Sequence, residues 1–273
     1  MSGARRTWSV SAVAAIAAFA ALALPAITPA ATPTTRPYEG SLGKFEDPDS
    51  VAVDEANGDV YVLDAGAETV SKFDGNLEAA EFSALGTNVI DGSASVACEV
   101  LCDGTPANGF AFNGSGDDQL AVDNSGNPLT AGDLYVADPR HRVVDVFAPS
   151  GTYLGQLTAA GESGPRFGEP CGVAVDPSGD VYVGEEARSE IDKYVPTANP
   201  PVDADFASAV AYPGCRLAAG AAATAGDLFA VPSWGMVERL EPGGSSQEVL
   251  QGPAAGAAVD AADGHLFVSG EGE

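Results

Sequence analysis

The stretch Val173-Ala-Val-Asp176, followed by Gly179-Asp-Val-Tyr-Val-Gly-Glu185, decides the fold of this chain. Its first part is a short apolar run of small residues, which is typical of a strand buried on both faces. Asp176 and Gly179 favour a tight turn, because aspartate accepts hydrogen bonds from nearby backbone amides and glycine adopts positive φ. Tyr182 lies within the second run, where an aromatic ring can fill the space between packed sheets. The stretch therefore predicts a β-hairpin.

This hairpin pattern recurs along the chain, and the repetition is the strongest signal in the sequence. The Gly-Asp or Gly-His turns begin at residues 58, 132, 179, 226 and 264, so they lie 74, 47, 47 and 38 residues apart. An aromatic residue follows each turn: Tyr61, Tyr135, Tyr182, Phe229 and Phe267. A third segment of alternating polarity, such as Val70–Phe73, predicts a half-exposed strand. Tyr153–Leu157 is the best candidate for a fourth, outer strand.

Small sheets of three or four strands cannot bury both faces alone, but stacking them around an axis does so. The sequence therefore predicts an all-β chain, a β-propeller of four-stranded antiparallel blades, with about five blades present and the last one incomplete. A β-sandwich with accidental internal similarity is the alternative. The propeller is expected over residues 38–273, with blades near 45–83, 117–160, 167–210, 214–250 and 253–273. Residues 84–116 are interpreted as an insertion, with a degenerate blade as the alternative.

The full pattern resembles the NHL repeat. The first copy reads Phe45-Glu-Asp-Pro48 and then Val51-Ala-Val-Asp54, and Asp138-Pro-Arg-His-Arg-Val143 in the second copy resembles the segment that names the family. The resemblance covers roughly residues 38–269, without 84–116. It implies a propeller that usually has six blades, whereas this sequence supplies four fairly complete blades and part of a fifth. This count leaves the closure of the ring undecided, and an open edge would invite association.

The first thirty residues have the features of a signal peptide. Arg5 and Arg6 precede the apolar segment Val10–Leu24, and small residues around Ala30 and Ala31 resemble a cleavage site. Residues 31–37 are then a linker. The alternative is an uncleaved membrane anchor, although the apolar run is short for a span. We expect a secreted, extracellular protein without a stable membrane span after cleavage.

The charge of the chain restricts its partners. The 39 acidic residues outnumber the 12 basic ones, for a net charge of −27. Residues 1–30 contain two arginines and no acid, so the chain without them has 10 basic against 39 acidic residues and a net charge of −29. A field of this sign repels phosphate backbones and anionic lipid surfaces, so we expect no nucleic-acid partner.

Four cysteines in an exported chain favour disulfides. The repeat register places Cys171 and Cys215 just before the inner strands of adjacent blades, which are neighbours, so we predict that these two pair. Cys98 and Cys102 can close a small loop in the insertion. Zinc is the weaker alternative, because no histidine accompanies either pair.

Candidate catalytic groups are few, and we predict no catalytic or metal-binding residue. NHL enzymes, such as amidating and antibiotic-inactivating lyases, use several histidines or a metal at the central face, whereas this chain has only His141 and His265. A ring of carboxylates on the axis could hold a divalent ion, but the same residues recur in register, as turn-capping residues do: Asp54, Asp123, Asp176 and Asp260. We expect no cofactor, with Ca²⁺ as the alternative.

The loops that join the second and third strands of each blade are the candidate partner-binding surface. An exposed tryptophan beside charged side chains is suited to protein contacts. The candidate contact residues are Arg140, His141, Glu186, Arg188 and Trp234. Ordinary solvated loop is the alternative for each of them.

These observations favour a binding or scaffold module for an extracellular protein, peptide or glycan over an enzyme. The alternative is a divalent-metal-dependent lyase or lactonase of propeller fold, which rests on fold analogy alone.

Overall fold

The computed structural model describes residues 41, 44–78, 110–114, 118–159, 167–221, 224–232, 235–242, 244–252, 254–260 and 263–270. The chain divides into two units, Met1–Ser41 and Leu42–Glu273, and every strand that the structure describes lies in the second. The predicted signal peptide, the linker and Cys98 and Cys102 lie outside the described residues. Within the described part of the chain, no helix is long and apolar enough to cross a membrane.

The described residues of the second unit form five antiparallel sheets, which we name A to E in chain order. Sheet A contains β1 (Pro48–Asp54), β2 (Asp59–Asp64) and β3 (Thr69–Phe73). Sheet B contains β4 (Leu120–Val122), β5 (Leu134–Asp138), β6 (Val143–Phe147) and β7 (Tyr153–Leu157). Sheet C contains β8 (Pro170–Val175), β9 (Val181–Glu185), β10 (Glu190–Tyr194) and β11 (Phe206–Ala211), with the short 3-10 helix Asp203–Asp205 before β11. Sheet D contains β12 (Arg216–Ala219), β13 (Leu228–Val231), β14 (Val237–Leu240) and β15 (Ser246–Leu250), and sheet E contains β16 (Ala254–Val259) and β17 (Leu266–Gly270).

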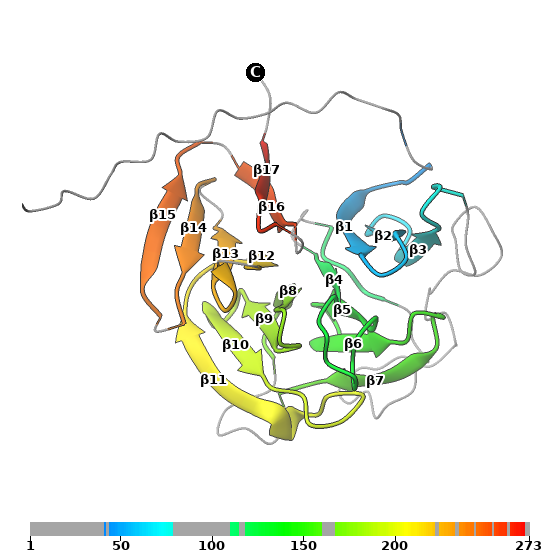
Figure 1. Cartoon of the computed structure of the whole chain (residues 1–273), viewed down its shortest axis with the longest axis horizontal. Helices are drawn as coiled ribbons and strands as arrows, with labels where there is room; N and C mark the ends of the chain where they lie inside the picture. Colours follow the sequence, from blue (N-terminus) through cyan, green and yellow to red (C-terminus); the bar gives the residue numbers. More distant parts are fainter. Residues whose placement is uncertain are drawn as a thin grey trace, which may run out of the picture. The chain divides into compact units, whose positions relative to one another are not determined.

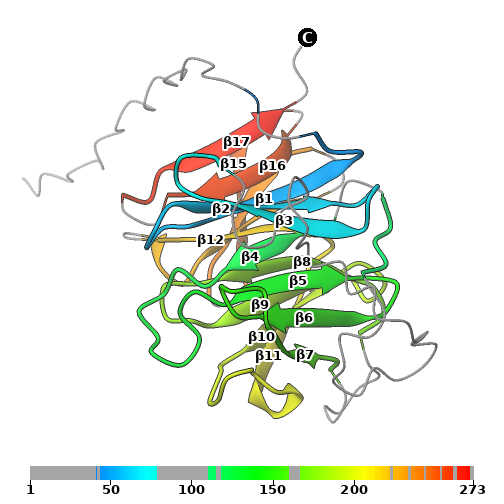
Figure 2. The same cartoon turned by 90° about the vertical axis from the view of Figure 1, so that its right-hand side faces the viewer.

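Sheets A to D are arranged as four blades of a β-propeller. The first strand of each sheet packs beside the first strand of the next, in the series β1, β4, β8, β12 and β16. Figure 1 shows β4, β8 and β12 near the centre and β7, β11 and β15 at the periphery. Figure 2 shows from the side that the four strands of sheet B follow one another in chain order. The two-stranded sheet E packs its first strand against sheet D.

The repeated aromatic residue packs between neighbouring sheets, as the sequence predicts. Tyr61 belongs to a buried cluster with side chains of sheet B, and Tyr135 to one with side chains of sheet C. Tyr182 packs in the same way against sheet D, and Phe229 against Ala254 of sheet E. Each of sheets A to D therefore buries its ring against the following sheet, and this contact fixes the stacking. The prediction is wrong for Phe267 of sheet E, which is 45% exposed.

In sheets A, B and C, a carboxylate at the end of the second strand fixes the segment that leads into the same sheet. Asp64 accepts hydrogen bonds from the backbone amides of Glu46 and Asp47, both at 2.8 Å. Glu185 accepts from Gly168 and Glu169 in sheet C. Asp138 accepts from Ala111 in sheet B. Phe110 and Phe112, on either side of Ala111, are also buried in the core.

Two expectations about burial are wrong in sheet A. The strand that contains Val51 was expected to be buried, but Val51 is 64% exposed and Val53 43% exposed. The reason is that β1 packs beside β4 on one side, while no comparable packing joins it to β16 among the described residues. The third strand, expected to be half exposed, is almost wholly buried in β3, because Lys72 is covered and paired with Asp59.

Cys171 and Cys215 form a disulfide, as the repeat register predicts. Cys171 lies within β8 rather than before it, because that strand begins at Pro170. The outer strand Tyr153–Leu157 is confirmed as β7. The outer strands β11 and β15 were not predicted, because exposed edge strands carry little hydrophobic periodicity.

Candidate functional site

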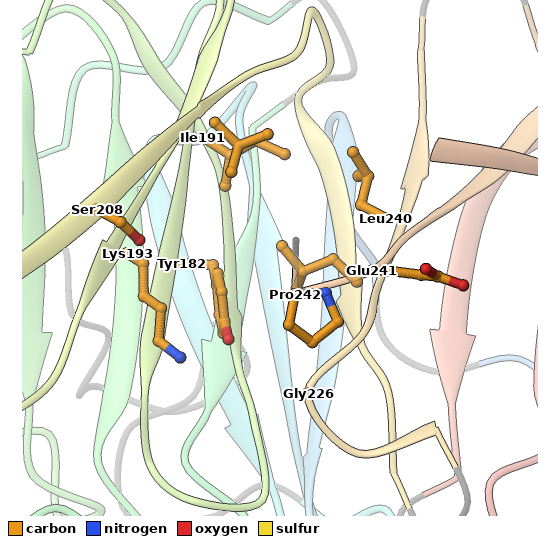
Figure 3. A pocket seen from close by; sticks show the side chains of 10 residues that line it. Tyr182, Ile191, Lys193, Ser208, Gly226, Leu240, Glu241 and Pro242 are labelled. Carbon is orange, nitrogen blue, oxygen red and sulfur yellow. The ribbon is translucent and has the colours of Figure 1, made fainter. Parts of the chain in front are cut away.

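A pocket opens between sheets C and D. Sheet C contributes Tyr182, Ile191 and Lys193, and Figure 3 shows them across from Leu240 and Pro242 of sheet D. The pocket has a volume of about 490 Å³ including its open mouth. The full lining comprises Tyr182, Ile191, Lys193, Ser208, Val210, Gly226, Leu228, Leu240, Glu241 and Pro242.

The polar groups of the pocket are held in place by neighbours on the same sheet. Lys193 and Tyr182 are cross-strand partners in the β9–β10 pairing. The Lys193 ammonium lies 2.6 Å from Asp180 and 5.1 Å from the centre of the Tyr182 ring. The Tyr182 hydroxyl donates a hydrogen bond to Asp176 at 3.1 Å. The lysine is therefore a fixed cation above an aromatic face, an arrangement that also stabilises the ring.

Neither group is tuned for proton transfer near neutral pH. Burial raises the pKa of Tyr182 to about 12, and the hydrogen bond and charge of Lys193 act in the opposite direction. Burial lowers the pKa of Lys193, but the hydrogen bonds to Asp180 and Tyr182 outweigh it, so the pKa is raised overall. A general acid or base works best with a pKa near the working pH. At neutral pH both side chains therefore keep their protons.

Sheets A and B contain the same arrangement of lysine, aspartate and tyrosine, but there the neighbouring sheet contacts it directly. There Lys72 pairs with Asp59 at 2.8 Å and lies over the Tyr61 ring. The carbonyl of Pro149, in the β6–β7 turn, accepts hydrogen bonds from Lys72 at 3.1 Å and from the Tyr61 hydroxyl at 3.4 Å.

The counterpart of Pro149 in sheet D is Pro242, in the β14–β15 turn. Pro242 lines the pocket between sheets C and D without closing it. No hydrogen bond joins Pro242 to Lys193 or Tyr182 in the described part of the chain. The side chain of Lys193 is 30% exposed, against 5% for Lys72. The equivalent contact between sheets A and B is closed, whereas the one between sheets C and D is open and forms the pocket.

The predicted contact residues lie in the turns that join the second and third strands of sheets B and C. Arg140 is exposed, whereas His141 is half-buried and its Nδ1 lies 2.8 Å from an Asp138 oxygen. That hydrogen bond raises the pKa of His141. Glu186 is exposed, and Arg188 pairs with Glu190 and lies 3.5 Å from Asp192.

These predicted residues do not line the pocket, and most of them have partners within their own turn or strand. Trp234 lies outside the described residues. The sequence analysis singled out Tyr182 only as a repeat residue. It did not predict the pocket, for two reasons. The strand register places Tyr182 beside Lys193, and the opening depends on how the neighbouring sheet D packs.

The recurring aspartates act as turn caps where the structure describes their bonds. Asp54, Asp123 and Asp176 each accept a hydrogen bond from the backbone amide two residues further on, at 2.8 to 2.9 Å. Among the described residues, no group of three or more His, Cys, Asp or Glu side chains is placed to hold a metal ion.

Comparisons with known proteins support the fold. No protein-family model matches the chain, and no curated protein matches it. Among solved structures, a chain of a nidogen/laminin complex is similar over 82% of this chain and 72% of its own length, with 15% identity and a TM-score of 0.50. This likeness supports the β-propeller and, at this identity, shows the fold alone.

Two bacterial proteins are similar with lower scores. Virginiamycin B lyase from Staphylococcus aureus matches over 81% of this chain with 12% identity and a TM-score of 0.46. Hydrazine synthase from Kuenenia stuttgartiensis matches over 83% with 12% identity and a TM-score of 0.48. This chain spans 62% and 55% of their lengths, respectively.

Proposed function

We propose that this chain is an extracellular NHL-type propeller that binds a protein, peptide or glycan and does not catalyse a reaction. The Cys171–Cys215 disulfide supports an oxidising location. The repeat pattern and the signal-peptide features of residues 1–30 support the family and the export. In this proposal, sheet E is the inner half of an incomplete fifth blade, because β16 continues the series of inner strands.

The observation that carries the binding role is the pocket between sheets C and D. Its walls are mainly apolar, and its lysine and tyrosine have pKa values raised away from neutrality. A pocket with apolar walls and a few oriented polar groups is typical of a site that receives a ligand group. With a net charge of −27, the chain favours a basic partner by long-range attraction. We therefore propose a basic peptide segment that inserts one apolar side chain.

The test uses a variant that fills the pocket without disturbing the core. Ser208 is an exposed residue of β11 that lines the pocket, so Ser208→Tyr places a ring in the opening. Ala209 is the next residue, is exposed and does not line the pocket, so Ala209→Tyr is the matched control. The probes are fluorescein-labelled heptapeptides selected from a random phage-displayed library on the immobilised full chain.

We expect the selected peptides to be basic with one apolar residue, and to lose at least about tenfold in affinity for Ser208→Tyr but not for Ala209→Tyr. Equal binding to both variants would exclude the pocket as the site. Hydrolysis of lactones or p-nitrophenyl esters that depends on Ca²⁺ and stops with EDTA would overturn the non-catalytic role.

A further inference from the structure

Three of the four blades contain the same internal ion pair. The aspartate of the Gly-Asp turn is bound by a cation from the third strand, which lies opposite the repeated aromatic residue. In sheet A the pair is Asp59 with Lys72 at 2.8 Å, and in sheet C it is Asp180 with Lys193 at 2.6 Å. In sheet D, Arg239 binds Asp227 at 2.6 Å.

Sheet B has the aspartate but not the cation. Asp133 follows Gly132, and the residue opposite Tyr135 in the β5–β6 pairing is Val146. Asp133 is nevertheless only 3% exposed, and its Oδ2 atom has no hydrogen-bond partner in the described structure. Burying a carboxylate oxygen without a partner costs free energy. A bound cation or a proton at this position would lower that cost.

Further unpaired oxygens surround Asp133. The Oδ2 atom of Asp123 and the hydroxyls of Thr130 and Tyr135 are buried, and none makes a hydrogen bond of adequate geometry among the described residues. The turn between β4 and β5 brings them together, because the Asp123 amide donates to the Asp133 carbonyl and the Asp133 amide to that of Thr130, both at 2.9 Å. This turn is longer than its counterpart in sheet C, and the extra length supplies Thr130.

The charges of these groups affect one another, which indicates that the groups lie close together. Burial raises the pKa of Asp133 to about 7, a hydrogen bond from Asn199 acts in the opposite direction, and the Asp123 charge raises it further. Burial also raises the pKa of Tyr135, with added contributions from Asp123 and Asp133, while the nearby Thr130 hydroxyl acts in the opposite direction.

A segment of sheet C covers this position. Asn199, between β10 and β11, donates a hydrogen bond to the Leu129 carbonyl at 2.8 Å. Asp203 of the same segment accepts from the amide and hydroxyl of Thr158 in sheet B. Asn199 is exposed and thus lies between the buried oxygens and the solvent.

We propose that Asp123, Thr130, Asp133 and Tyr135 form a binding site for a hard cation, Ca²⁺, which replaces the lysine or arginine of the other blades. The donors are all oxygens, which Ca²⁺ prefers, and two carboxylates balance a divalent charge. Waters complete the coordination of such an ion.

The test compares equivalent aspartates that differ only in having an internal cation. Asp133→Asn removes one carboxylate of the site, and Asp180→Asn is the matched control, because Asp180 already has Lys193. The full chain is stripped with EDTA and titrated with Ca²⁺, with Mg²⁺ and Na⁺ as further arms, while the thermal midpoint is measured. Tb³⁺ luminescence, which a nearby tyrosine sensitises, reports binding directly, with Tyr135→Phe as the probe of the donor.

We expect Ca²⁺ to raise the midpoint of the wild type and of Asp180→Asn, and to raise that of Asp133→Asn much less. The affinity for Tb³⁺ should fall at least about tenfold in Asp133→Asn. Val146→Lys restores the cation of the other blades and should abolish the response to Ca²⁺. If Ca²⁺ shifts Asp133→Asn and wild type equally, or shifts neither, the acidic surface or a bound proton accounts for the cluster and the site does not exist.

Discussion

Cys171 in β8 and Cys215 just before β12 join the inner strands of sheets C and D through a disulfide, with their Cα atoms 5.1 Å apart. The link crosses the interface of two blades that have no hydrogen-bonded strand pair between them. It therefore fixes a contact that otherwise depends on side-chain packing.

Removing this disulfide should lower the free energy of unfolding. The two cysteines are 44 residues apart, and closing a loop of that length stabilises a chain by about 4 kcal/mol in the chain-entropy account. We expect Cys171→Ala/Cys215→Ala to lose about this amount in denaturant unfolding. The control is Cys98→Ala/Cys102→Ala, measured under the same conditions. A loss below about 1 kcal/mol would contradict the predicted stabilisation.

Gly172 should tolerate no side chain, because the blades approach too closely there. A Cβ at this position would overlap the carbonyl group of Cys215. We expect Gly172→Ala to cost at least about 2 kcal/mol, since the obstruction is backbone and cannot rotate away. Gly126→Ala is the control, because nothing lies within 4 Å of its added Cβ, and it should change the free energy of unfolding by less than about 0.5 kcal/mol. Equal effects would show that sheets C and D do not approach as described.

The valines of the inner strands should differ sharply in their contribution to stability. Val173 is 1% exposed, whereas its counterpart Val51 is 64% exposed. We expect Val173→Ala to cost about 2 kcal/mol and Val51→Ala less than about 0.5 kcal/mol, in denaturant unfolding. A large cost for Val51→Ala would mean that another segment or a second molecule covers β1 in solution.

Asp133 should make the protein less stable as the pH rises. The folded state retains its proton up to about pH 7, whereas the unfolded chain loses it near the ordinary aspartate value of 3.8. Between these values the folded state binds more protons, so the free energy of unfolding falls as pH increases. Between pH 5 and pH 8 in EDTA, we expect the wild type to lose about 3 kcal/mol more than Asp133→Asn.

The comparison with Asp133→Asn is required because other groups shift in the same direction. Burial also raises the pKa of Asp118 to about 6, with contributions from Asp49 and Asp138, and this change remains in the variant. An identical pH profile for both proteins would show that Asp133 does not carry a raised pKa.

Much of the architecture could be predicted from local patterns. The hairpins and the Cys171–Cys215 pair followed from the repeat register. The exposure of Val51 could not be predicted, because it depends on which sheet lies beside β1. In the identical Val-Ala-Val sequence of β8, Val173 and Ala174 are buried. The pocket could not be predicted either. Pro149 and Pro242 occupy equivalent turns, but Pro149 accepts a hydrogen bond from the preceding blade, whereas Pro242 lines the pocket.

The sequence by itself determined the strands, the turns and the internal repeat, because these depend on periodicity, on turn residues and on backbone preferences over a few positions. Only the tertiary structure decided that Asp133 is buried without the cation of the other blades, since the covering segment comes from the next sheet. Burial and proximity are properties of packed surfaces far apart in the chain, and these properties turn a repeated aspartate into a candidate site.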